Sequence, residues 1–204
     1  MEDRAWQLPE LEPLYAVNAR CIEMLVQAAR ADRPSTLPLV QAIRDELLAL
    51  TSEARSRAAR CPILLVDMQF ADFGGWRFAN QRPTRPGRVA AWRGAFPRAA
   101  GAHLARITLM LAWHLVRLDQ QMACLFLGMT PPVAAVLAGL SVTEVLQVAE
   151  VRFRHARPRW EDRPWVWRRL ILAAESGDMR KVRDFDVYSV QLITGELLSP
   201  TVRI

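Results

Sequence analysis

The side chains best suited to a chemical role in this sequence are four arginines in one short stretch, Arg152, Arg154, Arg157 and Arg159. A guanidinium group pairs well with phosphate oxygens, and each phosphate it neutralises releases counterions. Residues 151–155 alternate apolar and charged, a pattern typical of an extended strand with its first two arginines on one side. The stretch therefore predicts contact with nucleic acid. The alternative is a solvated face whose charge is neutralised by the nearby acids Glu150, Glu161 and Asp162.

A second group of arginines lies in residues 77–103, which contain six arginines and no acidic residue. The net charge of the whole chain is also +6, because the segments on either side carry opposite net charges that cancel. Prolines and glycines interrupt this stretch, so we expect a linker or long loop. It is either a solvated connection or a basic arm that touches nucleic acid or an acidic partner. The candidate contacts in it are Arg82, Arg85 and Arg88.

Sequence patterns of enzymes are missing from the chain. It has no GxSxG turn, HExxH helix, phosphate-binding Walker loop or GxGxxG turn. Its histidines, His103, His114 and His155, are scattered, and we expect His114 to be a core residue. Glu161 and Asp162 suit the region before a helix N-terminus better than a catalytic pair. We therefore expect no enzymatic activity and no cofactor.

Three tryptophans after the arginine stretch favour packing. Trp160, Trp165 and Trp167 are expected to anchor the core, and the alternative is an aromatic patch for a partner.

Three widely spaced cysteines, Cys21, Cys61 and Cys124, form no pair at the spacing of a zinc site. Their odd number, without an N-terminal apolar run, favours the reducing cytoplasm. Apolar stretches such as residues 107–116 are shorter than the roughly 20 residues that span a bilayer. We expect a cytoplasmic protein without a metal site or membrane segment.

The first half of the chain reads as helices followed by a short apolar run. Apolar spacing predicts helices over residues 13–30, 37–50 and 51–59, the last of them capped by Thr51. Residues 63–66 are continuously apolar, and periodicity alone does not decide between a buried strand and a core segment.

The second half carries the stronger helix signals. Thr130 precedes a proline at a helix start, and Ser141 with Glu144 forms a capping box. The junction at Leu140 and Ser141, where one helix ends and the next begins, is the firmest local prediction. The expected helices cover residues 104–118, 131–140, a segment after Ser141, 164–177 and 185–198.

The two halves resemble each other. At an offset of 87 residues, an Arg-x-Asp sequence ends the first helix of each half; at an offset of 90, Leu50-Thr51 aligns with Leu140-Ser141. These matches predict two copies of one helical unit. The predicted divisions are an N-terminal unit over residues 1–76, a linker over 77–103 and a C-terminal unit over 104–204.

The order of motifs in the C-terminal unit resembles the FlhD family of flagellar transcriptional regulators. The resemblance rests on Arg117-x-Asp119, the stretch Cys124–Thr130, Ala138-Gly-Leu-Ser141 and Leu146-x-x-Ala149. Fainter similarity covers Tyr15-Ala-Val-Asn18, Ala49-Leu-Thr51 and Ile193–Ser199.

The resemblance implies an all-α fold, dimerisation through intertwined helices, and transcription activation with a zinc-binding FlhC-like partner that makes much of the DNA contact. Family members are about half this length, so a tandem copy would make one chain a pseudo-dimer. Many members also carry a cysteine that can bridge subunits. The aligned positions here are Val66 and Ala156, so such a disulfide is not expected.

These observations together predict an all-α protein of small multi-helix bundles, with two FlhD-like units in tandem as a pseudo-dimer or an intertwined dimer. The predicted function is transcriptional control of flagellar or related genes with an FlhC-like partner and DNA. An alternative is a non-DNA-binding adaptor or chaperone-like component of a flagellar or type III secretion system. An enzyme is the least favoured class.

Overall fold

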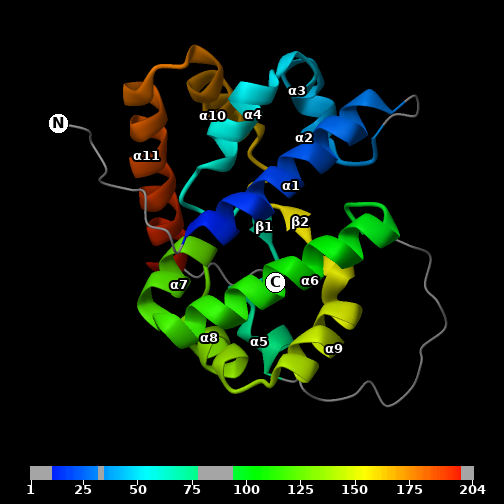
Figure 1. Cartoon of the computed structure of the whole chain (residues 1–204), viewed down its shortest axis with the longest axis vertical. Helices are drawn as coiled ribbons and strands as arrows, with labels where there is room; N and C mark the ends of the chain where they lie inside the picture. The colour runs from blue at the N-terminus through cyan, green and yellow to red at the C-terminus, as the bar shows by residue number, and fades with distance from the viewer. Residues whose placement is uncertain (1–10, 32–34, 78–93, 199–204) are drawn as a thin grey trace.

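Two long helices, α1 (Glu12–Arg30) and α6 (Arg98–Leu118), pack against each other at the centre of the protein (Figure 1). The computed structural model describes residues 11–31, 35–77 and 94–198. Within these residues every element is helical apart from a two-stranded sheet, so the predicted all-α class is confirmed. The predicted first helix is also confirmed: Pro13 lies in the first turn of α1, whose apolar stripe is buried.

Three short helices follow α1. The predicted single helix over residues 37–50 is wrong, because Ile43 leaves helical geometry (φ −127°, ψ 29°) and separates α2 (Pro38–Ala42) from α3 (Arg44–Ala49). Apolar spacing continues through the break, since both sides of it bury their side chains, and periodicity therefore gave no sign of it. The predicted cap of the third helix is confirmed: the Thr51 side chain accepts the amide of Ala54 at the start of α4 (Ser52–Ala59).

The apolar run over residues 63–66 leads into a strand. The strand β1 (Val66–Asp67) pairs antiparallel with β2 (Arg157–Pro158), Val66 opposite Pro158 and Asp67 opposite Arg157. The very short helix α5 (Phe73–Trp76) follows β1 and buries Trp76.

The predicted linker is partly helical. Its last six residues, 98–103, belong to α6, with Pro97 at the N-cap position, so the expectation of irregular structure is wrong there. An unexpected helix, α7 (Gln120–Leu127), follows α6. The Asp119 carboxylate accepts the amide of Met122 at its start, and Gly128 ends it in the left-handed conformation.

The capped helices of the second half are close to prediction. Thr130 precedes α8 (Pro131–Ala138), but its hydroxyl donates to the Phe70 carbonyl and makes no capping bond. The capping box before α9 (Val142–Arg152) is confirmed, with both reciprocal bonds between Ser141 and Glu144. The predicted strand over residues 151–155 is wrong, because α9 continues through Arg152 and a 3-10 helix, η2 (Phe153–His155), follows.

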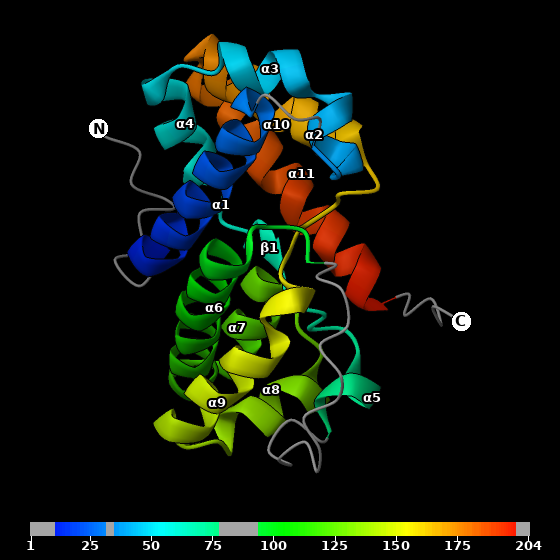
Figure 2. The ribbon, with the colours of Figure 1, turned by 90° about the vertical axis from the view of Figure 1, so that its right-hand side faces the viewer.

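A helical hairpin ends the described chain. Helix α10 (Pro164–Ser176) turns at Gly177 into α11 (Met179–Leu198), which begins six residues before its predicted start. Helix α10 lies beside α3 and α4, which are far away in sequence, while α5 lies beside α8 (Figure 2). The buried apolar residues of all these elements form one continuous cluster.

The helix α6 has the length and composition of a membrane span. Helices α7 and α8, which are bent relative to each other, would also have them if the two were counted as one segment. Half of the apolar stretch of α6 is buried within the protein, which is how a core helix behaves. No other helix among residues 11–31, 35–77 and 94–198 has the length and composition of a membrane span.

Candidate nucleic-acid and partner-binding surfaces

The four arginines at the end of α9 and just after it do not share one face, since η2 and β2 turn them in different directions. Arg152 and Arg159 are buried, at 8% and 6% exposure, while Arg154 and Arg157 are exposed. The period-two pattern suggested a common side for Arg152 and Arg154, and the helical geometry of residues 152–155 separates them.

Arg152 stabilises α5. Its guanidinium lies over the Trp76 ring, 4.1 Å from the ring centre, and its Nη1 donates to the Gly75 carbonyl at 2.9 Å. Burial lowers the pKa of Arg152, and the carboxylates of Asp72 and Asp67 act in the opposite direction. Arg152 therefore joins the end of α9 to a helix that is 77 residues away in sequence.

Arg159 binds three backbone carbonyls in the centre of the fold. Its Nε donates to Leu64 at 2.7 Å, and its Nη2 donates to Leu127 at 2.6 Å and to Val66 at 3.5 Å. Gly128 lies against this guanidinium: a Cβ added there would be 2.4 Å from Nη1. Arg159 is therefore a structural residue that joins β1 to the end of α7.

Arg154 and Arg157 remain at the surface. Arg157 forms an ion pair with Glu161 at 2.7 Å, the contact that the neutralised-face alternative anticipated. An exposed pair of this kind stabilises the fold little and can exchange for another anion. Glu161 thus lies before α10, as expected for an acidic residue near a helix start.

The surroundings of Arg154 and Arg157 are electropositive. The neighbouring His155 has a pKa below its ordinary value, first because it is half-buried and then because Arg152, Arg154 and Arg157 repel its charged form. The first turn of α6 packs against η2, and a Cβ on Gly101 would be 3.8 Å from the Phe153 carbonyl. The positive end of the α6 dipole therefore points toward the same corner.

Arg98 belongs to this corner. It is exposed in the first turn of α6. It was counted only as part of the basic linker, and the proline at 97, which favours a helix start, was the signal that could have placed it. We call Arg98, Arg154 and Arg157 the basic corner. Arg82, Arg85 and Arg88 lie outside the described residues, so their predicted contacts stay predictions.

A second candidate surface is the groove between α10 and α11, with a volume of about 760 Å³. We call it the hairpin groove. Trp165 and Leu172 project into it with 51% and 63% of their surface exposed. Its other lining residues are largely charged: Arg168, Arg169, Ala173, Glu175, Ser176, Lys181 and Asp184. Of the three tryptophans expected to anchor the core, Trp160 and Trp167 are buried, whereas Trp165 is not.

Ring contacts hold one end of the hairpin groove. The Trp165 and Tyr188 ring centres are 6.0 Å apart, and the Arg169 guanidinium lies 4.4 Å from the Tyr188 ring centre. Arg168 reaches the other way and pairs with Glu46 of α3 at 2.7 Å. The walls of the groove are thus fixed by contacts before any partner arrives.

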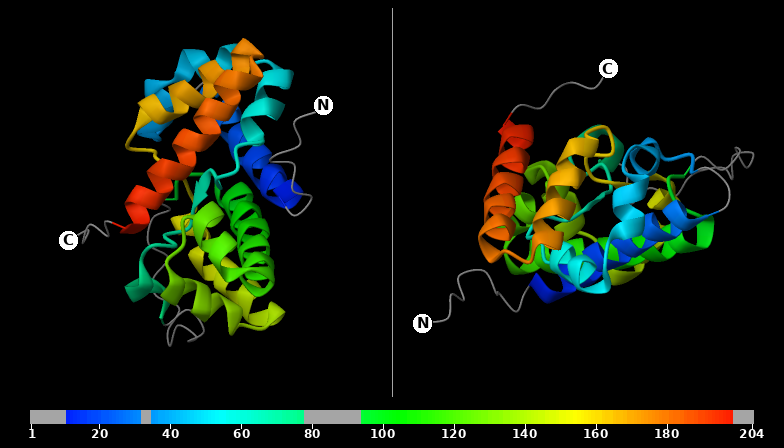
Figure 3. Two further views of the ribbon diagram at one scale, coloured as in Figure 1. Left: turned by 90° about the vertical axis from the view of Figure 1, so that its left-hand side faces the viewer. Right: turned by 90° about the horizontal axis from the view of Figure 1, so that it is seen from above.

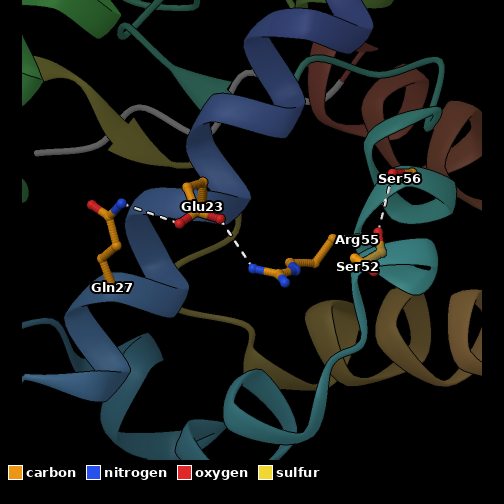
Figure 4. A network of polar contacts seen from close by, with 5 residues as sticks. All are labelled: Glu23, Gln27, Ser52, Arg55 and Ser56. Carbon is orange, nitrogen blue, oxygen red and sulfur yellow. Dashed lines mark hydrogen bonds and ion pairs between the residues drawn. The ribbon is translucent and has the colours of Figure 1, made fainter.

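Polar contacts between α1 and α4 have a structural role. Glu23 of α1 accepts from Gln27 on its own helix and pairs with Arg55 of α4 at 3.1 Å (Figure 4). On α4, Ser56 donates to the Ser52 carbonyl. These contacts hold two helices together at the surface.

The remaining chemically capable side chains do not gather into a site. His114, expected in the core, is exposed on α6, because apolar neighbours on either side of it fill the buried stripe. Cys21 and Cys61 are buried, and burial raises the pKa of each thiol to about 12. Within residues 11–31, 35–77 and 94–198, no three His, Cys, Asp or Glu residues could hold a metal together.

Residues 103–188 match the family model of FlhD, the flagellar transcriptional activator. The matched segment runs from α6 into α11 and includes Arg154 and Arg157 of the basic corner and all the lining residues of the hairpin groove. It confirms the resemblance over this segment and relates it to a family of transcriptional regulators, which is not a family of enzymes. No curated protein and no solved structure matches the chain.

Proposed function

Because residues 103–188 are an FlhD-family segment, we propose that this protein regulates transcription of flagellar or related genes together with an FlhC-like partner subunit. The family match is the observation that carries the proposal. In this role the protein is a helical platform in the cytoplasm that holds the partner, and its arginines add attraction to DNA phosphates.

The basic corner supports the DNA contact. Arg154 and Arg157 are exposed, and Arg98 extends the positive surface along the start of α6. Contacts of this type position a protein on the duplex without reading its sequence. Sequence readout then belongs to the partner or to the complex as a whole. Arg152 and Arg159 serve this role only indirectly, because their guanidinium groups are engaged inside the fold.

An electrophoretic mobility shift on promoter DNA tests this proposal. We expect a shift that needs the FlhC-type partner and that weakens steeply between about 50 mM and about 200 mM salt. Replacing Arg154 and Arg157 with glutamine should reduce the slope of log K against log salt by about 2, since each phosphate contact contributes about 0.9.

The matched control is Arg30→Gln, an exposed arginine at the end of α1 away from the basic corner. It should leave the salt slope unchanged. If the double variant keeps the full slope, the phosphate contact lies elsewhere and residues 82–88 become the next segment to mutate. Absence of a shift in every combination of protein and partner would contradict the regulator.

The hairpin groove supports the partner contact. Trp165 and Leu172 are exposed on one face of α10, two turns apart, like the apolar anchors that dominate protein interfaces. Arg169 and Lys181 line the groove beside them. We therefore assign it an amphipathic partner helix that carries apolar anchors and flanking acidic residues.

The adaptor alternative uses the same groove. A non-DNA-binding component of a secretion system would also need an apolar anchor site with a charged rim, and Trp165 with Leu172 provides one. The salt-dependent shift distinguishes the two: an adaptor binds its protein partner, loses that binding in Leu172→Ser, and never shifts DNA.

A further inference from the structure

We infer that this chain folds as an intramolecular pseudo-dimer, in which two related helical units exchange the helices that follow their strands, α5 and α10, around an approximate two-fold axis. The inference deepens the proposed function, and its biological meaning rests on that function. The geometric evidence for it comes from this chain alone. It concerns the described residues 11–31, 35–77 and 94–198. The partner that each unit fits is therefore the other half of the same chain.

The first set of observations is a matching order of elements. In each half a long helix packs on a capped helix: α1 on α4 in the first, α6 on α9 in the second. The caps, Thr51 and Ser141, are 90 positions apart, and each accepts the amide three residues later. Two shorter helices separate the long helix from the cap in both halves.

The correspondence continues after the capped helices, where the offset becomes 91. Gln69 and Trp160 are the two non-glycine residues with positive φ among the described residues, at 59° and 55°. Each accepts a backbone bond from the residue three positions on, Asp72 and Arg163, and a helix begins directly afterwards. Left-handed backbone at a non-glycine residue is uncommon, so its recurrence at equivalent positions is a specific match.

Tryptophans occupy the fourth position of both following helices. Trp76 and Trp167 are buried, and each indole donates to a backbone carbonyl just before its helix, Gln69 at 2.9 Å and Arg159 at 2.7 Å. An offset of 90 would place Trp160 opposite Phe70, so the one extra residue is needed to bring both pairs into register. The offset changes from 90 to 91 after the capped helices, where α9 and η2 together are longer than α4.

The strand pairing shows how the two units are related in space. At an offset of 91, Arg157 is the counterpart of Val66, and Pro158 is the counterpart of Asp67. Val66 pairs with Pro158, and Asp67 pairs with Arg157. Each residue thus pairs with the counterpart of its neighbour, which is the reciprocal contact that a two-fold axis produces.

The helix that follows the strand in each unit crosses to the other unit, while α11 of the second unit has no counterpart among the described residues of the first. Helix α5 packs on α8, and its counterpart α10 packs on α3 and α4. In Figure 3 the short α5 lies among the helices of the second half, and α10 lies among those of the first. Cross-unit hydrogen bonds accompany both exchanges, from Arg152 to the Gly75 carbonyl and from Arg57 to the Ala174 carbonyl.

This arrangement places a subunit-type interface inside one polypeptide. The contacts of α1 with α6 and of β1 with β2 lie along the axis and are satisfied within the chain. A second copy is then unnecessary, and the protein is a monomer. The symmetry is incomplete, because α10 is 13 residues long and α5 only four.

Light scattering and a designed disulfide test the inference on the full chain without DNA or partner, so the outcome is independent of the proposed function. We expect the single-chain mass of 23.1 kDa at both about 5 µM and about 200 µM protein, because an obligate dimer would change with concentration or keep twice this mass. A mass of two chains at both concentrations would overturn the inference.

The disulfide joins Val66→Cys to Pro158→Cys. The amide of Arg159 donates to the Leu65 carbonyl, so Leu65 and Arg159 form a hydrogen-bonded pair. The adjacent pair, Val66 and Pro158, is therefore non-hydrogen-bonded, and Cα atoms in such a pair lie about 4.5 Å apart. On mild oxidation the bond should form within one chain, with unchanged mass on a non-reducing gel. A covalent dimer would mean that the units pair between chains. Val66→Cys alone is the control, and if the double variant fails to fold, the wild-type mass decides.

Discussion

At the scale of single residues, Arg159 shows that a basic side chain in a basic stretch can be structural. Its guanidinium binds the carbonyls of Leu64, just before β1, of Val66 in β1 and of Leu127 in α7, and its own carbonyl accepts the Trp167 indole. A buried donor set of this kind is costly to remove, because the carbonyls left behind lose partners that water does not replace.

The variant Arg159→Met should therefore unfold more easily, by about 3 kcal/mol or more, because charged hydrogen bonds contribute about 1.5–3 kcal/mol each. Urea unfolding followed by circular dichroism measures it. Arg157→Met is the matched control: the same change two residues away, at an exposed ion pair, should cost less than about 1 kcal/mol. Equal effects at the two positions would contradict the structural role of Arg159.

A substitution at Gly128 also tests the structural role of the Arg159 guanidinium, which Gly128 contacts. It has φ +59°, and an added Cβ would collide with Arg159 Nη1, so Gly128→Ala combines backbone strain with a steric clash. Gly177→Ala is the control, since Gly177 has φ +65° and nothing within 4 Å of its added Cβ. We expect a loss of about 1 kcal/mol for Gly177→Ala and clearly more for Gly128→Ala. Equal losses in thermal or urea unfolding would show that the guanidinium moves aside.

At the scale of elements, the sequence was most informative where a local signal sets the structure. The caps at Thr51 and Ser141 act within one turn, and both are present. Helix α7 was missed although Asp119 and Gly128 bound it, because eight residues are too few for periodicity. The strand over 151–155 was wrong because α9 continues through Arg152 and η2 follows, and the Arg152 side chain packs on Trp76 from a segment far away in sequence.

The candidate site was predictable only in part for the same reason. Composition pointed to the arginine stretch, and two of its four arginines are exposed. The burial of the other two depends on β1, α5 and α7, which are distant in sequence and meet only after folding. The hairpin groove gave no signal, since Trp165 lies only two residues from the buried Trp167 and its exposure depends on where α11 packs.

The docking of α11 should depend on pH. Burial raises the pKa of Asp186 to about 7, and the groups that interact with it, Tyr15 and Cys61, add no neutralising charge. Because the folded pKa is above the unfolded one, the stability that protonated Asp186 provides is present near pH 4 and is lost as pH rises through about 7.

Thermal unfolding at intervals from about pH 5 to about pH 8 measures this effect. Wild type should lose stability relative to Asp186→Asn as pH rises, because asparagine cannot ionise. The comparison with the variant is needed since His155, whose pKa is lowered by burial, acts in the opposite direction over the same range. Parallel pH profiles for the two proteins would mean that Asp186 is hydrated.

At the scale of the whole molecule, the two halves share one core. The buried apolar cluster includes residues of α1, α4, α6 and α10, and no break in it separates the halves. Cross-half contacts also satisfy polar groups, since Arg159 supplies donors to the carbonyls of Leu64 and Val66. The first half on its own would therefore expose apolar faces of α3 and α4 and leave buried carbonyls without partners.

Splitting the chain between residues 93 and 94 tests this dependence. We expect the piece 1–93 alone to have little helical circular dichroism, and adding the piece 94–204 to restore it in a one-to-one complex. The physical reason is that α10 and Arg159, which cover and satisfy the first half, are both on the second piece. Titration followed by circular dichroism and sedimentation measures helicity and stoichiometry. Cooperative melting of the piece 1–93 by itself would show that the first half has a sufficient core of its own, and the shared core would then be two adjoining ones.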